Sequence, residues 1–448
     1  MAATLLETQT SKRLPFVSLI LILSEFCLFF YYNFMLFVIE LVRRKRNPNH
    51  YSDGFIILTR LLSIMYVFFI SKIKIQTFIY KHYLTQEMSI FIFDTFHQSS
   101  KLLNTFIAHT ETVYSIDYAT FDSGQYICSG SQDKTVRVWD IENNKQMQSF
   151  NGHSYSVNCV KFSKYYYQNY RFNVICSSSK DNTIRFWDFK RNRQLNLFNE
   201  HFRSVYGIEF SPFGGGRYLC SGSDDKTIRL WDVETSKSLH VFNGHERGVW
   251  CVDISPLQSN NNYNKTNSIG VIGGNGYTIC SGSFDKTIRT WDIETTKELI
   301  KFKGHKSGVN SVKYGSNELL NTILSGSDDK SVYLWDNRSG KQTQVFNGHT
   351  DYVYTVEYSP FVVNNIEIGC YSNVICSGSM DNTICFWDIR SNKKELSVIK
   401  GDNDNDDEED GILCLKFISL KKRLNTKNNT YALNLCYGSI KGPIYIWG

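Results

Sequence analysis

One short pattern recurs along this chain and limits what the chain can fold into. In one copy, residues 220–232 read CSGSDDKTIRLWD. A Ser-Gly-Ser stretch leads into an Asp-Lys turn, and the run that follows is apolar at every second position and ends in Trp-Asp. Because such alternation is typical of a β-strand with one buried face, we interpret the unit as a strand, a two-residue hairpin turn and a second strand.

The same unit occurs seven times. Five other copies are close matches that end at Asp140, Asp188, Asp292, Asp336 and Asp388, and a degraded copy, YGSIKGPIYIWG, ends at Gly448. A length of 448 residues would by itself suggest two or three domains. The repetition instead predicts one supersecondary unit stacked seven times, which absorbs most of that length into a single array.

Each copy belongs to a longer repeat. An alternating outer segment comes first, a loop with a histidine follows, and a Val-x-x-Val-x-Phe/Tyr strand precedes the Ser-Gly-Ser unit, as in residues 353–358. The loop histidines are His109, His153, His201, His245, His305 and His349. We divide the array into repeats at residues 101–140, 145–188, 193–232, 237–292, 297–336, 341–388 and 393–447.

The loop histidine and the Trp-Asp ending, present together in six copies, resemble the WD40 family over residues 101–448. The resemblance implies an all-β, seven-bladed WD40 β-propeller in which each repeat supplies the outer strand of one blade and the inner three of the next. The sequence supports this independently, because residues 102–107 form a spare outer strand that could complete the last blade and remove both sheet edges. A rival for the closing place of residues 444–447 is Ile90–Asp94, which looks like a degraded third strand.

The resemblance also implies that the histidine, a strand serine, the turn aspartate and the tryptophan form one hydrogen-bonded tetrad in each blade. An enzyme would need a single exposed set rather than six copies, so we expect no catalytic residues. The predicted tetrad members are His109, Asp133, Trp139, His153, Asp181, Trp187, His201, Ser221, Asp225, Trp231, His245, Asp285, Trp291, His305, Ser325, Asp329, Trp335, His349, Asp381 and Trp387. In the last copy Asp402 stands near the expected histidine and Lys441 replaces the aspartate, so we expect the last blade to be the weakest.

In WD40-like propellers, three positions per blade point at the central opening: three and five residues after the histidine, and the residue before the turn aspartate. Here the predicted protein-binding residues of this top face are Tyr114, Lys180, Tyr206, Asp224, Trp250, Phe284, Asn310, Asp328, Tyr352, Tyr354 and Met380. Aromatic side chains at such an opening are typical anchors for a peptide or loop. We therefore predict a non-catalytic scaffold or adaptor that binds other proteins.

An alternative is a substrate-recognition subunit of a larger complex, such as a ubiquitin ligase or a signalling assembly, that reads a modified peptide. It would need several basic residues at the opening, where Lys180 stands nearly alone beside Asp224 and Asp328.

Composition excludes several other classes. A net charge of +6 over this length is too weak to imply nucleic acid. The 12 cysteines contain no CxxC spacing, and Cys128, Cys176, Cys220, Cys280 and Cys376 occupy one repeat position that we expect to be buried. The acidic run at residues 402–410 lacks the glycine of a calcium loop. We expect no metal, cofactor, nucleic acid or small-molecule substrate.

Residues 1–100 lie outside the repeat and contain an N-terminal hydrophobic helical segment. Residues 15–39 are almost wholly apolar, and about 25 residues of helix span about 37 Å, which is enough to cross a bilayer. The basic run at residues 43–46 favours a cytoplasmic propeller on a transmembrane helix. A second apolar stretch, residues 61–70, is too short to span. The alternative is a mis-assigned start, with translation beginning at Met88 and a protein that is soluble in the cytoplasm or nucleus.

Overall fold

The computed structural model describes residues 91–122, 124–255, 277–315, 319, 321–362, 374–390, 395–401, 410–422 and 430–448. The predicted membrane segment at residues 15–39 lies outside these ranges, as do residues 61–70 and 402–409. Among the helices within them, none combines the length and the apolar composition needed to cross a membrane.

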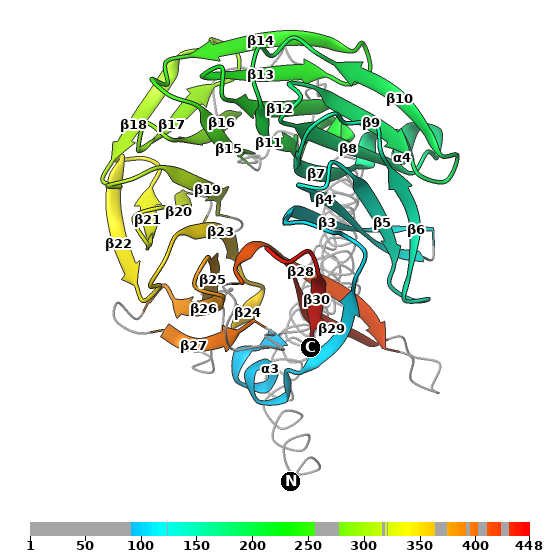
Figure 1. Ribbon diagram of the computed structural model, residues 1–448. Helices are drawn as coiled ribbons and strands as arrows, with labels where there is room; N and C mark the ends of the chain where they lie inside the picture. The colour runs from blue at the N-terminus through cyan, green and yellow to red at the C-terminus, as the bar shows by residue number, and fades with distance from the viewer. Residues whose placement is uncertain are drawn as a thin grey trace, which may run out of the picture. The chain divides into compact units, whose positions relative to one another are not determined.

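The described residues form seven four-stranded antiparallel sheets that follow one another around a ring (Figure 1). Their innermost strands, from blade one to blade seven, are β3 (Val113–Phe121), β7 (Val157–Ser163), β11 (Val205–Phe210), β15 (Val249–Ile254), β19 (Val309–Tyr314), β23 (Val353–Tyr358) and β28 (Ile412–Lys422). The second strands are β4 (Gly124–Ser131), β8 (Val174–Ser179), β12 (Tyr218–Ser223), β16 (Thr278–Ser283), β20 (Thr322–Ser327), β25 (Val374–Ser379) and β29 (Thr430–Ser439).

The third strands carry the tryptophans of the repeat. They are β5 (Val136–Asp140), β9 (Ile184–Asp188), β13 (Thr227–Asp232), β17 (Thr287–Asp292), β21 (Ser331–Asp336), β26 (Thr383–Asp388) and β30 (Ile444–Trp447). The outermost strands are β6 (Lys145–Phe150), β10 (Arg193–Phe198), β14 (Lys237–Asn243), β18 (Glu298–Lys303), β22 (Lys341–Asn347), β27 (Glu395–Lys400) and β2 (Leu102–Phe106). A short helix, α4 (Lys164–Tyr170), and a 3-10 turn, η1 (Gly214–Gly216), lie between the first two strands of blades two and three.

Except in blade two, where Ser178 takes its place, the glycine of the Ser-Gly-Ser unit packs against the next blade. A Cβ added at Gly222 would lie 2.8 Å from a methyl group of Val249, and one at Gly130 would lie 2.6 Å from Val157. The missing side chain thus lets the first strand of the next blade approach closely. The cysteine before this unit, such as Cys220, is fully buried and free, as expected for a small apolar filler.

The Asp-Lys turn is longer than predicted. In blade one, the Ser131 N–H donates to the Thr135 carbonyl (3.3 Å) and the Lys134 N–H to the Ser131 carbonyl (3.2 Å), so residues 132–134 form a three-residue loop. Lys134 has a φ of 70°, the left-handed conformation that follows a type I turn in such loops. The two-residue prediction was wrong because the residue before Asp133 also belongs to the turn.

The ring closes through the two ends of the array. Strand β2 pairs with β30, with Leu102 opposite Trp447 and Phe106 opposite Ile444. Gly438 of blade seven faces Val113 of blade one, as the equivalent glycines do elsewhere. The prediction of an all-β, seven-bladed propeller is therefore confirmed.

The prediction that Ile90–Asp94 could compete for the closing place was wrong. Phe91–Ile92 form β1, which pairs in parallel with β24 (Phe361–Val362), and the chain then turns into helix α3 (Phe93–Ser99). The helix buries Phe93 and Phe96 against Phe386 of blade six, with ring centroids 5.0 and 6.3 Å from it. An apolar run this short fits either a strand or a helix, and here packing on blade six decides.

Candidate functional site

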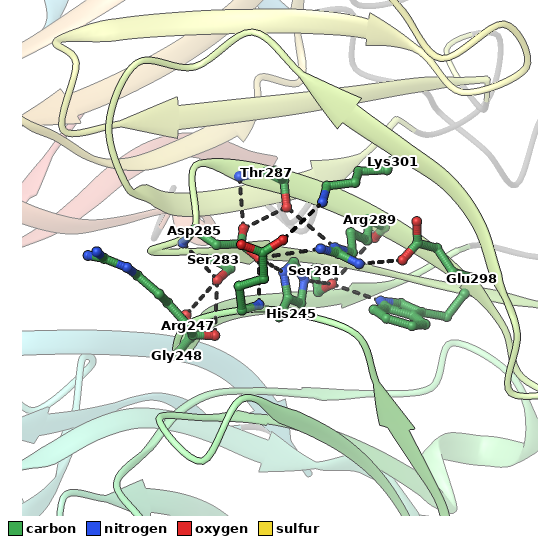
Figure 2. Close-up of polar contacts among 12 residues, drawn as sticks. His245, Arg247, Gly248, Ser281, Ser283, Asp285, Thr287, Arg289, Glu298 and Lys301 are labelled. Carbon is green, nitrogen blue, oxygen red and sulfur yellow. Dashed lines mark hydrogen bonds and ion pairs between the residues drawn. The ribbon is translucent and has the colours of Figure 1, made fainter.

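Blade four contains a chain of four polar side chains (Figure 2). His245 lies between two partners, with Nδ1 2.8 Å from an Asp285 carboxylate oxygen and Nε2 2.8 Å from the Ser281 hydroxyl. The Trp291 indole N–H donates to that same hydroxyl oxygen at 2.8 Å. Thr287 donates to the second carboxylate oxygen of Asp285 (2.6 Å), so the aspartate end of this hydrogen-bonded series is also fixed.

Five other blades repeat this arrangement. The histidine–aspartate distances in the six blades lie between 2.7 and 3.0 Å. The serines that join histidine to tryptophan are Ser129, Ser177, Ser221, Ser281, Ser325 and Ser377. The structure thus brings together all the predicted tetrad members of blades one to six.

The protonation states follow from burial. Burial lowers the pKa of His245 and outweighs the hydrogen bond that its imidazole donates to Asp285, which acts to raise the pKa. Burial alone would raise the pKa of Asp285, but the hydrogen bonds with His245 and Thr287 hold it well below its usual range. A neutral imidazole therefore donates a hydrogen bond from Nδ1 to the Asp285 carboxylate and accepts one at Nε2 from the Ser281 hydroxyl.

Serine, imidazole and carboxylate in this order also make up the triad of a serine hydrolase. Ser281, however, has an exposed fraction of 0%, and its oxygen already accepts the Trp291 N–H. A substrate carbonyl cannot reach such an oxygen. Chemically, the arrangement satisfies four buried polar groups at once and fixes a loop and a turn to the second and third strands of the blade.

Four of the predicted binding residues come together at the opening of blades three and four. The ring of Tyr206 lies 5.6 Å from that of Trp250, which stacks on Phe284 at 5.3 Å and an interplanar angle of 23°. With Asp224 and Gly248 they line a pocket of about 460 Å³. A side chain at Gly248 would clash with Asp224, since a Cβ there would lie 2.5 Å from its carboxylate.

The other predicted binding residues lie outside this pocket, and their binding role stays a prediction. Tyr114 donates to Gln132 (3.0 Å), and Asn310 donates to Asp328 (2.7 Å). Burial raises the pKa values of Tyr114, Tyr354 and Asp328. The side chains of Lys180 and Tyr352 are exposed, and Met380 is half-buried.

Sequence reasoning missed the basic side chains of the pocket. Arg203 and Arg247 follow the loop histidines by two residues, and Lys226 follows the turn aspartate; all three line the cavity. Arg203 forms an ion pair with Asp224 (3.5 Å), and the Arg247 guanidinium lies over the ring of Phe284 at 5.3 Å. The signal was a His-x-Arg sequence, which blades three and four have and the other four loop-histidine copies lack.

Below the opening, a ring of charged side chains surrounds the axis. One residue of each innermost strand contributes: Asp117, Lys161, Glu209, Asp253, Lys313, Glu357 and Lys416. Glu209 of blade three pairs with Lys161 of blade two (2.6 Å) and with Lys313 of blade five (3.5 Å), a contact that passes blade four. Burial alone would raise the pKa of Glu209, but these lysines lower it to about 2. The predicted binding residues lie on the rim above this ring.

The comparisons with known proteins agree with this geometry. The family model "WD domain, G-beta repeat" matches residues 100–140, 144–188, 192–232, 236–292, 296–336 and 340–388, more than half of the chain. This chain belongs to the WD40 repeat family. Propellers of the WD40 family are usually non-catalytic and typically serve as protein-interaction scaffolds. The six matches do not include residues 393–447, the degraded seventh copy, although three strands of the seventh sheet, β28, β29 and β30, lie there.

Individual WD40 relatives match over short segments. The chain is 36% identical over 58 residues to coatomer subunit beta'-1 of Arabidopsis thaliana, which covers 13% of this chain and 6% of the relative. It is 37% identical over 60 residues to the WD repeat-containing protein WDS homolog of the same plant, covering 13% and 11%. It is 39% identical over 51 residues to the peroxisomal targeting signal 2 receptor of Mus musculus, covering 11% and 16%. The matched segments span well under a quarter of the length of each of these relatives.

Proposed function

We propose that this WD40 propeller is a non-catalytic scaffold that binds a peptide or loop of another protein at the opening of the ring. One observation carries the proposal: the contiguous aromatic surface of Tyr206, Trp250 and Phe284. Phe284 keeps 38% of its surface exposed, and the other two side chains are half-buried. Large aromatic side chains left partly open to solvent in a pocket are the usual anchors of protein interfaces.

The tetrads support a non-catalytic role. All six serines have an exposed fraction of 0%, and each is already bonded to both an imidazole and an indole. Acyl transfer would need a serine that substrate can reach. The polar chemistry of the repeat thus stabilises blades, while the rim is left to bind.

Quantitative affinity purification tests the proposal. The variants introduce residues that stand at the equivalent positions of other blades. Trp250→Asn introduces the residue found at the same place in blades two and five, and Phe284→Asp the residue found there in blades three and five. A matched control is Phe202→Ser, because Phe202 is 79% exposed on the same face but does not line the pocket. We expect a discrete set of proteins to be lost from both pocket variants and retained by the control. Equal recovery from all three would contradict the proposal.

We also propose that residues 15–39 tether the propeller to a membrane on its cytoplasmic side. The support is the length and apolar composition of the segment and the basic run at residues 43–46. The test is a carbonate wash and protease protection of the full chain tagged at its C-terminus. We expect the tagged protein to stay in the pellet and its tag to be accessible to protease. Release at the size expected from Met88 would instead indicate a soluble protein.

A further inference from the structure

The pocket between blades three and four joins an aromatic wall to a basic rim. Tyr206, Trp250 and Phe284 provide the wall, and Arg203, Lys226 and Arg247 extend around it. The pocket is open to solvent and has a volume of about 460 Å³, which leaves room for one or two side chains of a partner.

The charges of this pocket are not balanced. Asp224 is engaged by Arg203 at 3.5 Å, and Glu246 is within 3.7 Å of Lys301, which lies outside the lining. Within the described part of the chain, no carboxylate comes within ion-pair distance of Lys226 or Arg247. Three cations and two carboxylates give the lining a net charge of +1, and Lys226 and Arg247 have no ion-pair partner among the described residues.

Arg247 is held where a ligand would meet it. Its guanidinium lies 5.3 Å over the ring of Phe284, and its backbone carbonyl accepts a hydrogen bond from Ser283 at 3.2 Å. Figure 2 shows the side chain extending away from the tetrad of blade four rather than into it. A cation stacked on an aromatic ring keeps its remaining N–H groups available for an anion.

We propose that this pocket binds a partner segment in which an aromatic side chain adjoins an anionic group, the ring lying against Trp250 and Phe284 and the anion against Arg247 and Lys226. This inference rests on the proposed function and specifies its ligand. A basic segment would bring like charges together at the rim. A neutral apolar segment would cover Trp250 but leave both cations unpaired as they lose water. Carboxylates and phosphate groups share the required chemistry.

The test uses the purified full chain and fluorescently labelled peptides of 12 residues in a Gly-Ser background. The central residue is Trp, Leu or Ala, and both of its neighbours are Asp, phosphoserine, Ser or Lys. Dissociation constants are measured by fluorescence anisotropy at two salt concentrations. We expect the tightest binding for Trp between Asp or phosphoserine, about 30-fold weaker binding when Ala replaces Trp, and weaker binding at high salt. Comparison of the Asp and phosphoserine peptides shows whether the pocket prefers a carboxylate or a phosphate group.

Variants borrowed from other blades separate the two parts of the pocket. Trp250→Asn should weaken all Trp peptides about 30-fold. Arg247→Ser and Lys226→Asn, which copy the residues of blades five and two, should weaken the anionic peptides about 2- to 5-fold each and leave the Ser-flanked peptide unchanged. Lys286→Gln and Phe202→Ser are matched controls outside the pocket and should have no effect. A thermal melt of each variant checks that it is folded.

Several outcomes would overturn the inference. Equal or tighter binding of Lys-flanked or Ala-centred peptides would show that the ligand chemistry is wrong. If no peptide binds, but Trp250→Asn still loses protein partners in the affinity purification, the inference fails and the scaffold function stands. If no peptide binds and no partner is lost, both fail.

Discussion

Blade four and blade seven hold equivalent tryptophans in different ways. In blade four, the indole N–H of Trp291 donates to Ser281, which His245 and Asp285 hold in place. In blade seven, the buried indole nitrogen of Trp447 has no hydrogen-bond partner among the described residues. The place of the serine is taken by Tyr437, whose ring stacks on Tyr445 at 5.0 Å, and Lys441 stands where blade four has Asp285.

Blade seven is stabilised by segments from elsewhere in the chain. Its outermost strand is β2, which precedes blade one, and Phe106 of that strand packs on Trp139 of blade one at 5.1 Å. Tyr118 and Gln125 of blade one both donate to the Ser419 carbonyl of the long β28–β29 hairpin. The difference shows two ways to stabilise a blade. One is a buried hydrogen-bonded tetrad within the blade, and the other is strand pairing and packing with segments that are distant in the sequence.

The largest expected effect comes from removing β2. A chain that begins at Ile107 loses the outer strand of blade seven and exposes the edge of β30. We expect a loss of about 5 kcal/mol or more and aggregation, measured by urea unfolding and light scattering. The control is a chain that begins at Phe91, which keeps α3 and β2. Equal stability of the two truncated chains would show that blade seven does not depend on the terminal strand.

A matched pair of tryptophan substitutions sharpens the comparison. Trp291→Phe removes the indole that Ser281 and His245 depend on, so we expect a cost of about 3 kcal/mol. Trp447→Phe removes an indole N–H that has no described partner, so we expect about 1 kcal/mol or less. Urea unfolding of both variants gives the difference. If the two costs are equal, the tetrad hydrogen bonds do not distinguish the blades.

Acid should destabilise the blades that contain a tetrad more than it destabilises blade seven. The buried histidines of blades one, two and four have lowered pKa values in the folded state, so the unfolded chain binds more protons and stability falls as the pH drops below about 6.5. The tetrad aspartates also have lowered pKa values, and their contribution is lost further as the pH falls below about 4. Indole N–H exchange followed by NMR should therefore accelerate with acid for Trp139, Trp187 and Trp291, and much less for Trp447. An equal response of all four would contradict this.

The smallest effect concerns helix α3. His97 Nδ1 lies 2.8 Å from the Ser397 hydroxyl of β27, which joins the helix to blade six. Ser397→Ala should cost about 1 kcal/mol. A double-mutant cycle with His97→Ala should give a coupling energy near 0.5 kcal/mol or more if the bond contributes. A coupling of zero would mean that Phe93 and Phe96 hold the helix without it.

The sequence by itself determined the features that each repeat builds locally. Seven copies of one unit predicted seven blades, and the regular places of residues such as His245, Asp285 and Trp291 predicted which side chains would meet. These contacts need nothing beyond one repeat, because each tetrad joins the histidine loop to the second and third strands of one sheet and to the turn between them. The spare strand at residues 102–107 also predicted the closure of the ring, since an unpaired edge at each end calls for a partner.

The tertiary structure decided what depends on contacts between blades. The fold of residues 91–99 followed from packing on Phe386, and the pocket formed because Arg203 and Trp250, from different repeats, became neighbours. The pair of Glu209 and Lys313 joins blades three and five past blade four. Alternation along one strand sets which face a side chain takes, but it does not set which residues of another repeat lie opposite. That is fixed when the closed ring brings distant strands to one axis.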